Sequence, residues 1–529
     1  MRRLVQFLLL SSFLISTFVL SAPVLENSAQ ASSPTKAYIP ITPTRLLDTR
    51  KAESSSFLHE EDRDLRVSGI ESVPNTAIAV ALNVTVVNPS SDGFLTVWPA
   101  GLNKPATSNL NFLQNEVVPN LVTVGVGING SISLQGFLYS LSGSLDVLVD
   151  VVGWYVAGFN PINPTRIMDT RNGRGGITLK PGETRDLLVQ GAENLPAGSI
   201  GSVALNVTAV NPTQDWGYLT IWPTGTTKPT ASSLNFVAGE TAANAVLTGV
   251  GSGGMISIYN DVGNTDVLVD VTGWFDQGFD ALTPFRLVDT RTMPQYEKVG
   301  PGETLEFEVL GEGDVPLEGV GAVAMNITVT GPTEDGYLTV WPSGRGMPTA
   351  SSLNFVSGQT IPNAVISGVG DGGRISVYNA FGSVDVIVDV TGWYALSDTE
   401  GPQLVSLSMS PSSVNTALGA QSILFRARFT DDLAGMTTTT CCTRIDFESP
   451  SGNQQLAATF YPSSTLVSGS LLDGVYEFAL TVPAFSESGT WRVTSLAFYD
   501  QAMNSRALSG QSARDYLTGL GAPTTFVNN

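Results

Sequence analysis

The sequence predicts an all-β protein made of tandem antiparallel β-sandwiches, and three observations lead to this prediction. A segment of the form Pro-x-Arg-x-x-Asp-Thr-Arg occurs three times, with its first arginine at Arg45, Arg166 and Arg286, so the copies are 121 and 120 residues apart. Candidate strands inside each copy alternate between apolar and polar residues, and glycine-containing and proline-containing turns separate them. Repeats of this length match whole domains of roughly 100–150 residues rather than solenoid units of roughly 20–50.

The N-terminal residues 1–31 have the features of a signal peptide. Arg2 and Arg3 precede the apolar run Leu4–Leu20, and Ala29-Gln-Ala31 has the small residues of a cleavage site. We therefore expect a secreted or cell-surface (extracytoplasmic) protein with no membrane insertion after signal cleavage. An uncleaved N-terminal anchor is the alternative, because the apolar run approaches the roughly 18 residues of a membrane helix.

The third copy shows the expected module most clearly. In Val323–Val329 the odd positions are apolar and the even ones small or polar, which predicts a half-buried strand with one wet or polar face. About eight such strands per copy and no convincing helix indicate a sandwich, of jelly-roll type, in preference to a barrel. The other strands expected in this copy are Leu287–Arg291, Thr304–Leu310, Gly336–Trp341, Ser352–Val356, Ala364–Val369, Arg374–Tyr378 and Val384–Trp393.

The modules are expected at 38–157, 158–277 and 278–396, followed by a polar linker at 397–402 and a different domain at 403–529. In this last domain Leu404–Pro411, Ile423–Thr430, Val475–Val482 and Trp491–Tyr499 alternate as strands. This pattern fits a sandwich of immunoglobulin or fibronectin type without the Cys…Trp…Cys core of antibody domains.

Composition limits the classes of partner and the sources of stability. The chain has 26 Lys+Arg against 47 Asp+Glu, a net charge of −21, which disfavours nucleic acid and anionic lipid as partners. Its two cysteines are the adjacent pair Cys441-Cys442, which cannot join distant strands. Each module must therefore be stabilised by a hydrophobic core.

Several motifs carry a resemblance to known modules. Pro-x-Arg-x-x-Asp-Thr-Arg, Gly336-Tyr-Leu-Thr-Val-Trp-Pro342, Ala350-Ser-Ser-Leu-Asn-Phe355 and Asp385-Val-Ile-Val-Asp-Val-Thr-Gly-Trp393 resemble a module repeated in exported proteins of actinobacteria and related bacteria, over about 38–396. That resemblance implies no activity of the module itself, which often stands beside hydrolase or adhesion domains. The Ser-Pro-Ser start of the last domain, Gly489-Thr-Trp-Arg-Val493 and Tyr499-Asp-Gln-Ala-Met-Asn504 resemble the immunoglobulin-like modules at the ends of secreted bacterial proteins, over about 402–529.

Catalysis finds little support in the sequence. The single histidine, His59, stands in a charged and variable stretch, and neither a zinc cage of histidines nor a repeated histidine-based triad can be built. Aspartate pairs such as Asp385 and Asp389 share one strand face but lie about 13 Å apart at roughly 3.3 Å per residue, beyond the roughly 5–9.5 Å of glycosidases. We expect no enzyme; a glycoside hydrolase is the least favoured function.

The repeated arginines and aspartates admit two interpretations. The guanidinium groups could bind a carboxylate or sulfate of a glycan through paired hydrogen bonds. Alternatively they form a structural clasp in which each module's first strand is tied to its last, as by Arg286 with Asp389, and this interpretation is favoured because both residue types recur together. The residues assigned to the clasp are Arg45, Asp48, Asp150, Arg166, Asp169, Asp270, Arg286, Asp289 and Asp389.

The aromatic segment of each module also leaves two alternatives. Tyr337 and Trp341 fall on one strand face and Leu338 and Val340 on the other, so either the aromatic or the aliphatic face belongs to the core. If the aliphatic face does, the aromatic residues form a platform for sugar rings; if the aromatic face does, they are ordinary packing. The residues of the candidate platform are Trp98, Trp222, Tyr337 and Trp341.

Two sets of asparagines recur with the modules. Asn83, Asn206 and Asn326 match the glycosylation acceptor but lie within expected strands, which favours a role as polar ladder positions. The others are expected to hydrogen-bond loop backbone: Asn111, Asn235 and Asn354, together with Asn120, Asn244 and Asn363.

Oxygen-bearing residues near the last domain suggest one metal site. Hard oxygen ligands at strand ends and in the linker could hold a calcium ion, whereas solvated loop carboxylates are the alternative. The candidate ligands are Asp398, Glu400, Asp431, Asp432, Asp500 and Asn504.

Together these features favour an exported, non-catalytic, rod-like or beaded array that acts in cell-surface structure or adhesion. The expected partner is a cell-surface component or an extracellular polysaccharide, and no cofactor is required except, in one interpretation, calcium. The alternative function is a polysaccharide-binding module array that targets a cell-wall or extracellular glycan.

Overall fold

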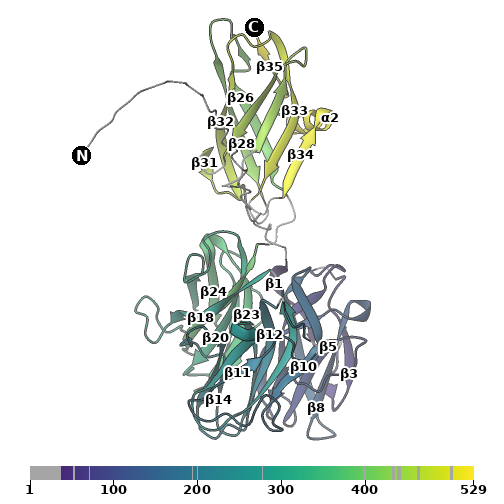
Figure 1. The fold of residues 1–529 in the computed structure, drawn as a ribbon, viewed down its shortest axis with the longest axis vertical. Coiled ribbons are helices and arrows are strands. Elements are labelled where there is room, and N and C mark those ends of the chain that lie inside the picture. Colours follow the sequence, from purple (N-terminus) through teal and green to yellow (C-terminus); the bar gives the residue numbers. More distant parts are fainter. Residues whose placement is uncertain are drawn as a thin grey trace, which may run out of the picture. The chain divides into compact units, whose positions relative to one another are not determined.

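The computed structural model (Figure 1) describes residues 37–529 except 52–53, 71, 194, 199, 277, 397–400, 432–434, 438–442, 462–464 and 501–503. The signal peptide expected at 1–31 and most of the linker expected at 397–402 lie outside the described residues. Strands dominate both the three modules before the linker and the domain after it.

The second module shows the topology of all three. Numbered in chain order, its eight strands form two antiparallel sheets with the orders 1-8-3-6 and 2-7-4-5, which is the jelly-roll arrangement. The first sheet contains β10 (Phe159–Asp169), β17 (Asp266–Phe275), β12 (Ser202–Val210) and β15 (Thr241–Gly249); the second contains β11 (Thr184–Leu188), β16 (Met255–Asn260), β13 (Gly217–Pro223) and β14 (Leu234–Phe236).

The first and third modules repeat this arrangement. The third has β18 (Phe279–Asp289), β25 (Asp385–Ala395), β20 (Val320–Thr330) and β23 (Thr360–Gly368) in one sheet and β19 (Thr304–Glu308), β24 (Arg374–Asn379), β21 (Gly336–Pro342) and β22 (Leu353–Phe355) in the other. The first module has β1 (Tyr38–Asp48), β9 (Ser144–Tyr155), β4 (Ala79–Val87) and β7 (Val117–Gly125) in one sheet. Its other sheet contains β3 (Asp62–Arg66), β8 (Ser131–Leu138), β5 (Gly93–Pro99) and β6 (Leu110–Phe112). Its short extra strand β2 (Phe57–Leu58) pairs with β9, and single 3₁₀ turns, η1 (Ile128–Gly130), η2 (Ser252–Gly254) and η3 (Asp371–Gly373), precede β8, β16 and β24.

Each module has its own core between its two sheets. Val323 and Ile327 of β20 are fully buried there, as the odd-position pattern predicts. The even positions were expected to form a face that is polar or exposed to solvent. This face is polar, but it is not exposed to solvent. Asn326 and Thr328 are polar but only 5% and 2% exposed, because the outer face of their sheet packs against the neighbouring modules.

The three modules close into a ring. A fifth apolar cluster draws residues from all three of them, among them Tyr38, Phe159 and Tyr394, and the third module also contacts the first. In Figure 1 the modules run from purple through teal to green and lie side by side. The expected rod-like or beaded array is therefore wrong for these modules. Only three residues separate β9 from β10, and only three separate β17 from β18, so successive modules are held close together.

The last domain is a separate sandwich with the strand order of an immunoglobulin-like fold, which confirms the prediction. One sheet contains β26 (Gln403–Ser410), β28 (Gln421–Thr430), β32 (Asp473–Val482) and β31 (Leu466–Gly469). The other contains β27 (Ser413–Val414), β35 (Thr525–Asn528), β33 (Gly489–Tyr499), β29 (Thr443–Glu448) and β30 (Gln455–Phe460), with β34 (Ser505–Ser509) beside β33.

One helix in this domain was not expected from the sequence. The helix α2 (Gly510–Gly519) buries Ala513 and Leu517, four residues apart, against the sandwich. Three apolar residues in ten, Ala513, Tyr516 and Leu517, give too weak a period to distinguish a helix from a loop. Among the described residues, no helix is both long and apolar enough to cross a membrane.

The shared cluster predicts that the ring unfolds as one unit. Tyr394→Ala removes a fully buried ring at the meeting point of the three modules, and such truncations cost about 3–5 kcal/mol. We expect calorimetry of the protein to show the transition of the whole ring shifted to lower temperature. Tyr139→Ala is the control, because that side chain is 72% exposed. A shift confined to the third module would contradict the shared core.

Candidate functional site

The repeated arginines and aspartates form ion pairs within each module. Nε and Nη2 of Arg286 donate to Oδ1 and Oδ2 of Asp389 at 2.6 and 3.1 Å, and Nη1 donates to Oδ2 of Asp289 at 3.1 Å. This joins β18 to β25, the first strand to the last. The expected pairs are present in all three copies, as Arg45 with Asp150 and Arg166 with Asp270.

The electrostatics of this cluster leave little capacity for a ligand. Arg291 donates to both oxygens of Asp289, and these hydrogen bonds lower the pKa of Asp289 to about 2. Burial raises the pKa of Asp389, and the hydrogen bonds from Arg286 oppose that effect. Both guanidinium groups are thus occupied by carboxylates of their own module, so a glycan carboxylate at Arg286 would have to displace a native partner.

The recurrent asparagines connect one module to the next. In each case the asparagine of the sixth strand donates its Nδ2 to Oδ1 of the asparagine on another module's third strand. The three bonds are Asn120 to Asn206 at 2.9 Å, Asn244 to Asn326 at 2.9 Å and Asn363 to Asn83 at 3.0 Å, and the last of them closes the ring.

Each of these asparagines also binds backbone. Nδ2 of Asn120 donates to the carbonyl of Asn109 within its own module at 2.6 Å, as the loop-backbone prediction requires. Oδ1 of Asn120 accepts the N–H of Ala245 in the second module at 2.9 Å, and Nδ2 of Asn206 donates to the carbonyl of Ser108 in the first module at 2.7 Å. The sequence interpretation missed these bonds between modules. A signal was available, because an asparagine inside a strand of every copy needs a partner when buried.

Six aromatic rings close the centre of the ring. Neighbouring centroids lie 4.6–5.0 Å apart around a complete hexagon, and the hydroxyls of Tyr155 and Tyr394 are 3.0 Å apart. The glycine before each late-strand tryptophan allows this packing, since a Cβ on Gly392 would overlap the ring of Phe279. The six rings are Tyr38, Tyr155, Phe159, Phe275, Phe279 and Tyr394.

The prediction that the tryptophans of the candidate platform are exposed to a glycan is wrong. Trp98, Trp222 and Trp341 are only 4%, 4% and 7% exposed. The aliphatic face, with Leu338 and Val340, does pack into the sandwich core, but the turn after each strand covers the indole on the other face. Each indole N–H donates to a carbonyl of that turn, at Leu102, Thr226 and Arg345, over 3.1–3.2 Å. Tyr337 is half-buried.

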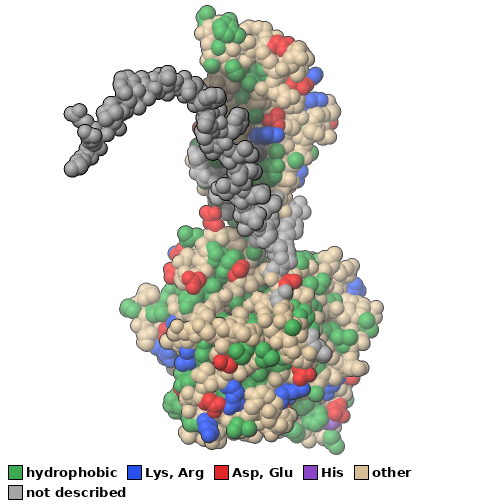
Figure 2. Space-filling model, in the orientation of Figure 1, with side chains coloured by type: hydrophobic (Ala, Val, Ile, Leu, Met, Phe, Trp, Pro, Cys, Tyr) green, Lys and Arg blue, Asp and Glu red, His purple; other side chains and the backbone are tan. Residues whose placement is uncertain are grey.

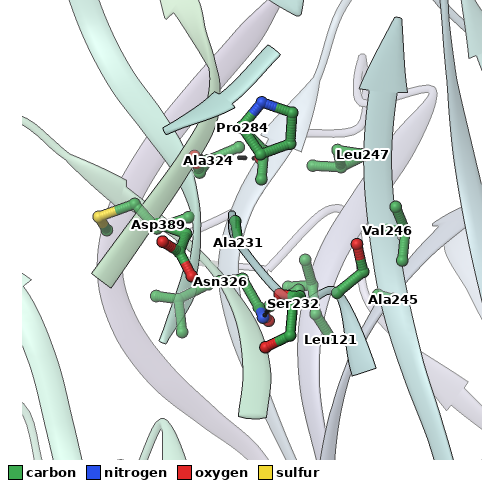
Figure 3. A pocket seen from close by; sticks show the side chains of 15 residues that line it. Leu121, Ala231, Ser232, Ala245, Val246, Leu247, Pro284, Ala324, Asn326 and Asp389 are labelled. Carbon is green, nitrogen blue, oxygen red and sulfur yellow. Dashed lines mark hydrogen bonds between the residues drawn. The ribbon is translucent and has the colours of Figure 1, made fainter. Parts of the chain in front are cut away.

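Small cavities lie where the modules meet. One of about 20 Å³ is lined mainly by the second and third modules, with Ser232, Pro284, Asn326 and Asp389, and also by Leu121 of the first (Figure 3). A similar cavity of about 10 Å³ lies between the third and first modules. A water molecule needs roughly 10–15 Å³ on this measure, so these cavities have room for about one water and not for a sugar.

A much larger groove is formed by all three modules together. Its volume is about 740 Å³, within the roughly 300–1,000 Å³ typical of ligand sites. One turn from each module borders it, at residues 113–116, 237–240 and 356–359. We call it the three-module groove. The groove includes Gly217-Tyr218 and Leu234-Asn235-Phe236, which belong to the second module's copies of two repeated motifs, but no site was predicted there from the sequence.

The turns that border the groove share one hydrogen bond. Glu116, Glu240 and Gln359 occupy equivalent positions, and each side chain accepts the backbone N–H three residues earlier at 2.7, 3.0 and 3.0 Å. The side chains are half-buried. Two carboxyl groups and one amide are therefore held in fixed positions in the groove.

The groove is acidic. Glu116, Asp215 and Glu240 line it, and among the described residues no lysine, arginine or histidine does. Burial raises the pKa of Glu116 and of Glu240; the charge of Asp92 adds to the first shift and the charge of Glu116 to the second. Elsewhere, on the face drawn in Figure 2, acidic and basic side chains are interspersed over the ring.

One tryptophan at the groove was missed by the sequence interpretation. Trp216 lines the groove and is 66% exposed, and it stands next to Asp215. Its signal was a break in the repeat: Asn83 and Asn206 are 123 residues apart but Trp98 and Trp222 are 124 apart. Trp216 is therefore an insertion found in the second copy alone.

The calcium ligands expected around the last domain are only partly described. Asp398, Glu400 and Asp432 lie outside the described residues, as do Cys441 and Cys442. Asp500 accepts hydrogen bonds from the backbone N–H and Nδ2 of Asn504, both at 2.8 Å, and Asp431 accepts one from Gly435 at 2.6 Å. Within the described part of the chain no three metal-ligating residues form a group, and calcium binding stays a prediction.

Comparison with known proteins adds one family match and three structural similarities. A family model described as a domain of unknown function (DUF7743) matches residues 396–521. No match was found among curated proteins.

The structural similarities are weak. The chain is similar to a triple-jelly-roll turret protein of an archaeal virus, at 10% identity and a TM-score of 0.16, over 67% of this chain and 91% of that one. It is also similar to a protein of Sulfolobus Turreted Icosahedral Virus, at 11% identity and 0.17, over 68% and 92%. The third is the tandem CBM22 domain of Paenibacillus barcinonensis Xyn10C, at 10% identity and 0.14, over 44% and 98%. At such TM-scores none of them informs function.

The clasp predicts a large cost for losing one arginine. Arg286→Ala leaves the carboxylate of Asp389 fully buried without its ion-pair partner, and removing one member of a buried pair costs roughly 3–5 kcal/mol. Chemical denaturation of the protein should show this loss. Arg291→Ala should cost roughly 0–1 kcal/mol, because that arginine is 43% exposed. Equal stability of Arg286→Ala and the unchanged protein would refute the clasp and revive ligand capture.

The groove glutamates predict a pH dependence. Because their folded pKa values are raised, the folded state binds their protons more tightly than the unfolded chain does, so they stabilise the fold at low pH. This contribution falls as pH rises from the unfolded pKa, roughly 4.3, through the raised folded values. The double variant Glu116→Gln and Glu240→Gln places at both positions the amide that Gln359 has in the third module. It should abolish this loss of stability with rising pH. Relative to the unchanged protein, the double variant should gain stability with rising pH; a difference that is constant with pH would contradict the shifts.

Proposed function

We propose that this protein is an exported, non-catalytic protein of cell-surface structure or adhesion, in which the ring of modules acts as one rigid body. The observation that carries the proposal is the closed ring itself. Its recurrent arginines, aspartates, asparagines and tryptophans all have partners inside the ring, so they account for architecture. The three-module groove is a surface that these contacts leave open to a partner.

The groove supports binding better than catalysis. A glycosidase needs two carboxyl groups whose surroundings move their pKa values apart, so that one donates a proton while the other stays ionised. Burial raises the pKa of both Glu116 and Glu240, so these two do not form such a pair, and the equivalent position in the third module is an amide. The single histidine of the chain lines no part of the groove.

A polysaccharide-binding role is the second candidate function. It is favoured by one observation, the exposed indole of Trp216 in the groove. This candidate is compatible with the first, because an adhesion protein can attach through a glycan.

Localisation and activity assays test the proposal. We expect an antibody against residues 32–529 to detect the protein on intact source cells or in their medium, and protease treatment of intact cells to remove the surface fraction. Incubation of the mature protein with polysaccharides should release no reducing ends. Retention in the cytoplasm would overturn export, and release of reducing ends that disappears in Glu116→Gln would establish an enzyme.

A further inference from the structure

We propose that the three-module groove binds a neutral, hydroxyl-rich oligosaccharide, with Trp216 as its stacking surface. The inference deepens the proposed function, on which it rests for its biological setting, by naming a ligand class and a site. Three features carry it: an exposed indole, a set of fixed polar groups and the charge of the groove.

The indole is the first feature. The structure describes all eight tryptophans, and Trp216 alone among them is exposed. An exposed indole leaves a large apolar surface in water, which is unfavourable unless a partner covers it. A pyranose ring has a flat C–H face that can cover an indole, while its hydroxyls remain free for polar partners. Trp216 is an insertion next to the groove, and it takes no part in the packing that accounts for the other tryptophans.

Fixed polar groups are the second feature. Amide side chains line the groove from the first module with Gln114, from the second with Asn235 and from the third with Gln359. Each amide offers both donors and an acceptor, and sugar hydroxyls also act in both ways. Glu116 and Glu240 add acceptors held in place by backbone hydrogen bonds. Polar groups positioned in advance lower the entropic cost of binding.

Charge is the third feature and decides between kinds of glycan. The groove contains three carboxyl-bearing residues and no basic one, which disfavours uronate and sulfated polymers by electrostatic repulsion. The roughly threefold symmetry of the ring is also broken here, since Trp216 occurs once and Gln359 replaces a glutamate. We therefore expect one oligosaccharide per ring rather than three.

Calorimetric titration of the mature protein tests the site. The probes are neutral hexasaccharides of glucose, xylose, mannose and N-acetylglucosamine, with an oligogalacturonate as the anionic probe. We expect at least one neutral probe to bind with a stoichiometry of one and the galacturonate not to bind. Trp216→Ala should weaken binding roughly 10-fold or more, as for other aromatic anchors. Deleting Trp216, which restores the spacing of the other copies, should have the same effect.

Tyr139→Ala is the matched control, since it removes an exposed aromatic ring outside the groove and should leave affinity unchanged. Thermal unfolding of each variant verifies the fold. Three kinds of result would overturn the inference: equal affinity of Trp216→Ala and the unchanged protein, a stoichiometry of three, or binding of the anionic probe alone or of no probe. All of these binding measurements use purified protein. A failure of oligosaccharide binding is therefore distinguishable from a failure of export, which the localisation assay detects.

Discussion

The meeting of three sheet faces at the centre of the ring is the interaction on which the rest of the structure depends. Each jelly roll has a core of its own, yet the outer face of one of its sheets is also apolar and ends in large aromatic side chains. Left in water, these faces would lose the hydrophobic stabilisation that their burial provides. Packing them together buries six aromatic rings and turns three repeats into one body.

Burial at this centre imposes a second constraint. Polar side chains on the same faces, such as Asn326, lose contact with water and must find partners. The cyclic asparagine bonds satisfy that need, and they do so across modules, which makes the relative orientation of the modules specific. The same desolvation raises the pKa of Asp389, so that the buried carboxyl group depends on Arg286.

Repetition and its interruption have different consequences. The residues that recur in every copy serve the frame, because equal modules around a closed ring need equal contacts. The groove, in contrast, combines Trp216, found in one module, with Glu116, Glu240 and Gln359, which differ in charge. A site in which a ring of repeats departs from its own symmetry can bind a ligand that lacks such symmetry.

By itself the sequence determined the number of modules, their β-sandwich class, most of their strands and the pairing of Arg286 with Asp389. These follow from repeat spacing and from period-two patterns, which reflect local geometry. Tertiary structure alone decided that Trp341 is covered by its own turn, that Asn363 bonds to Asn83, and that turns of three modules enclose one groove. Each of these depends on what lies against a sheet face. The alternation of residues along a strand distinguishes its two faces but does not specify their neighbours.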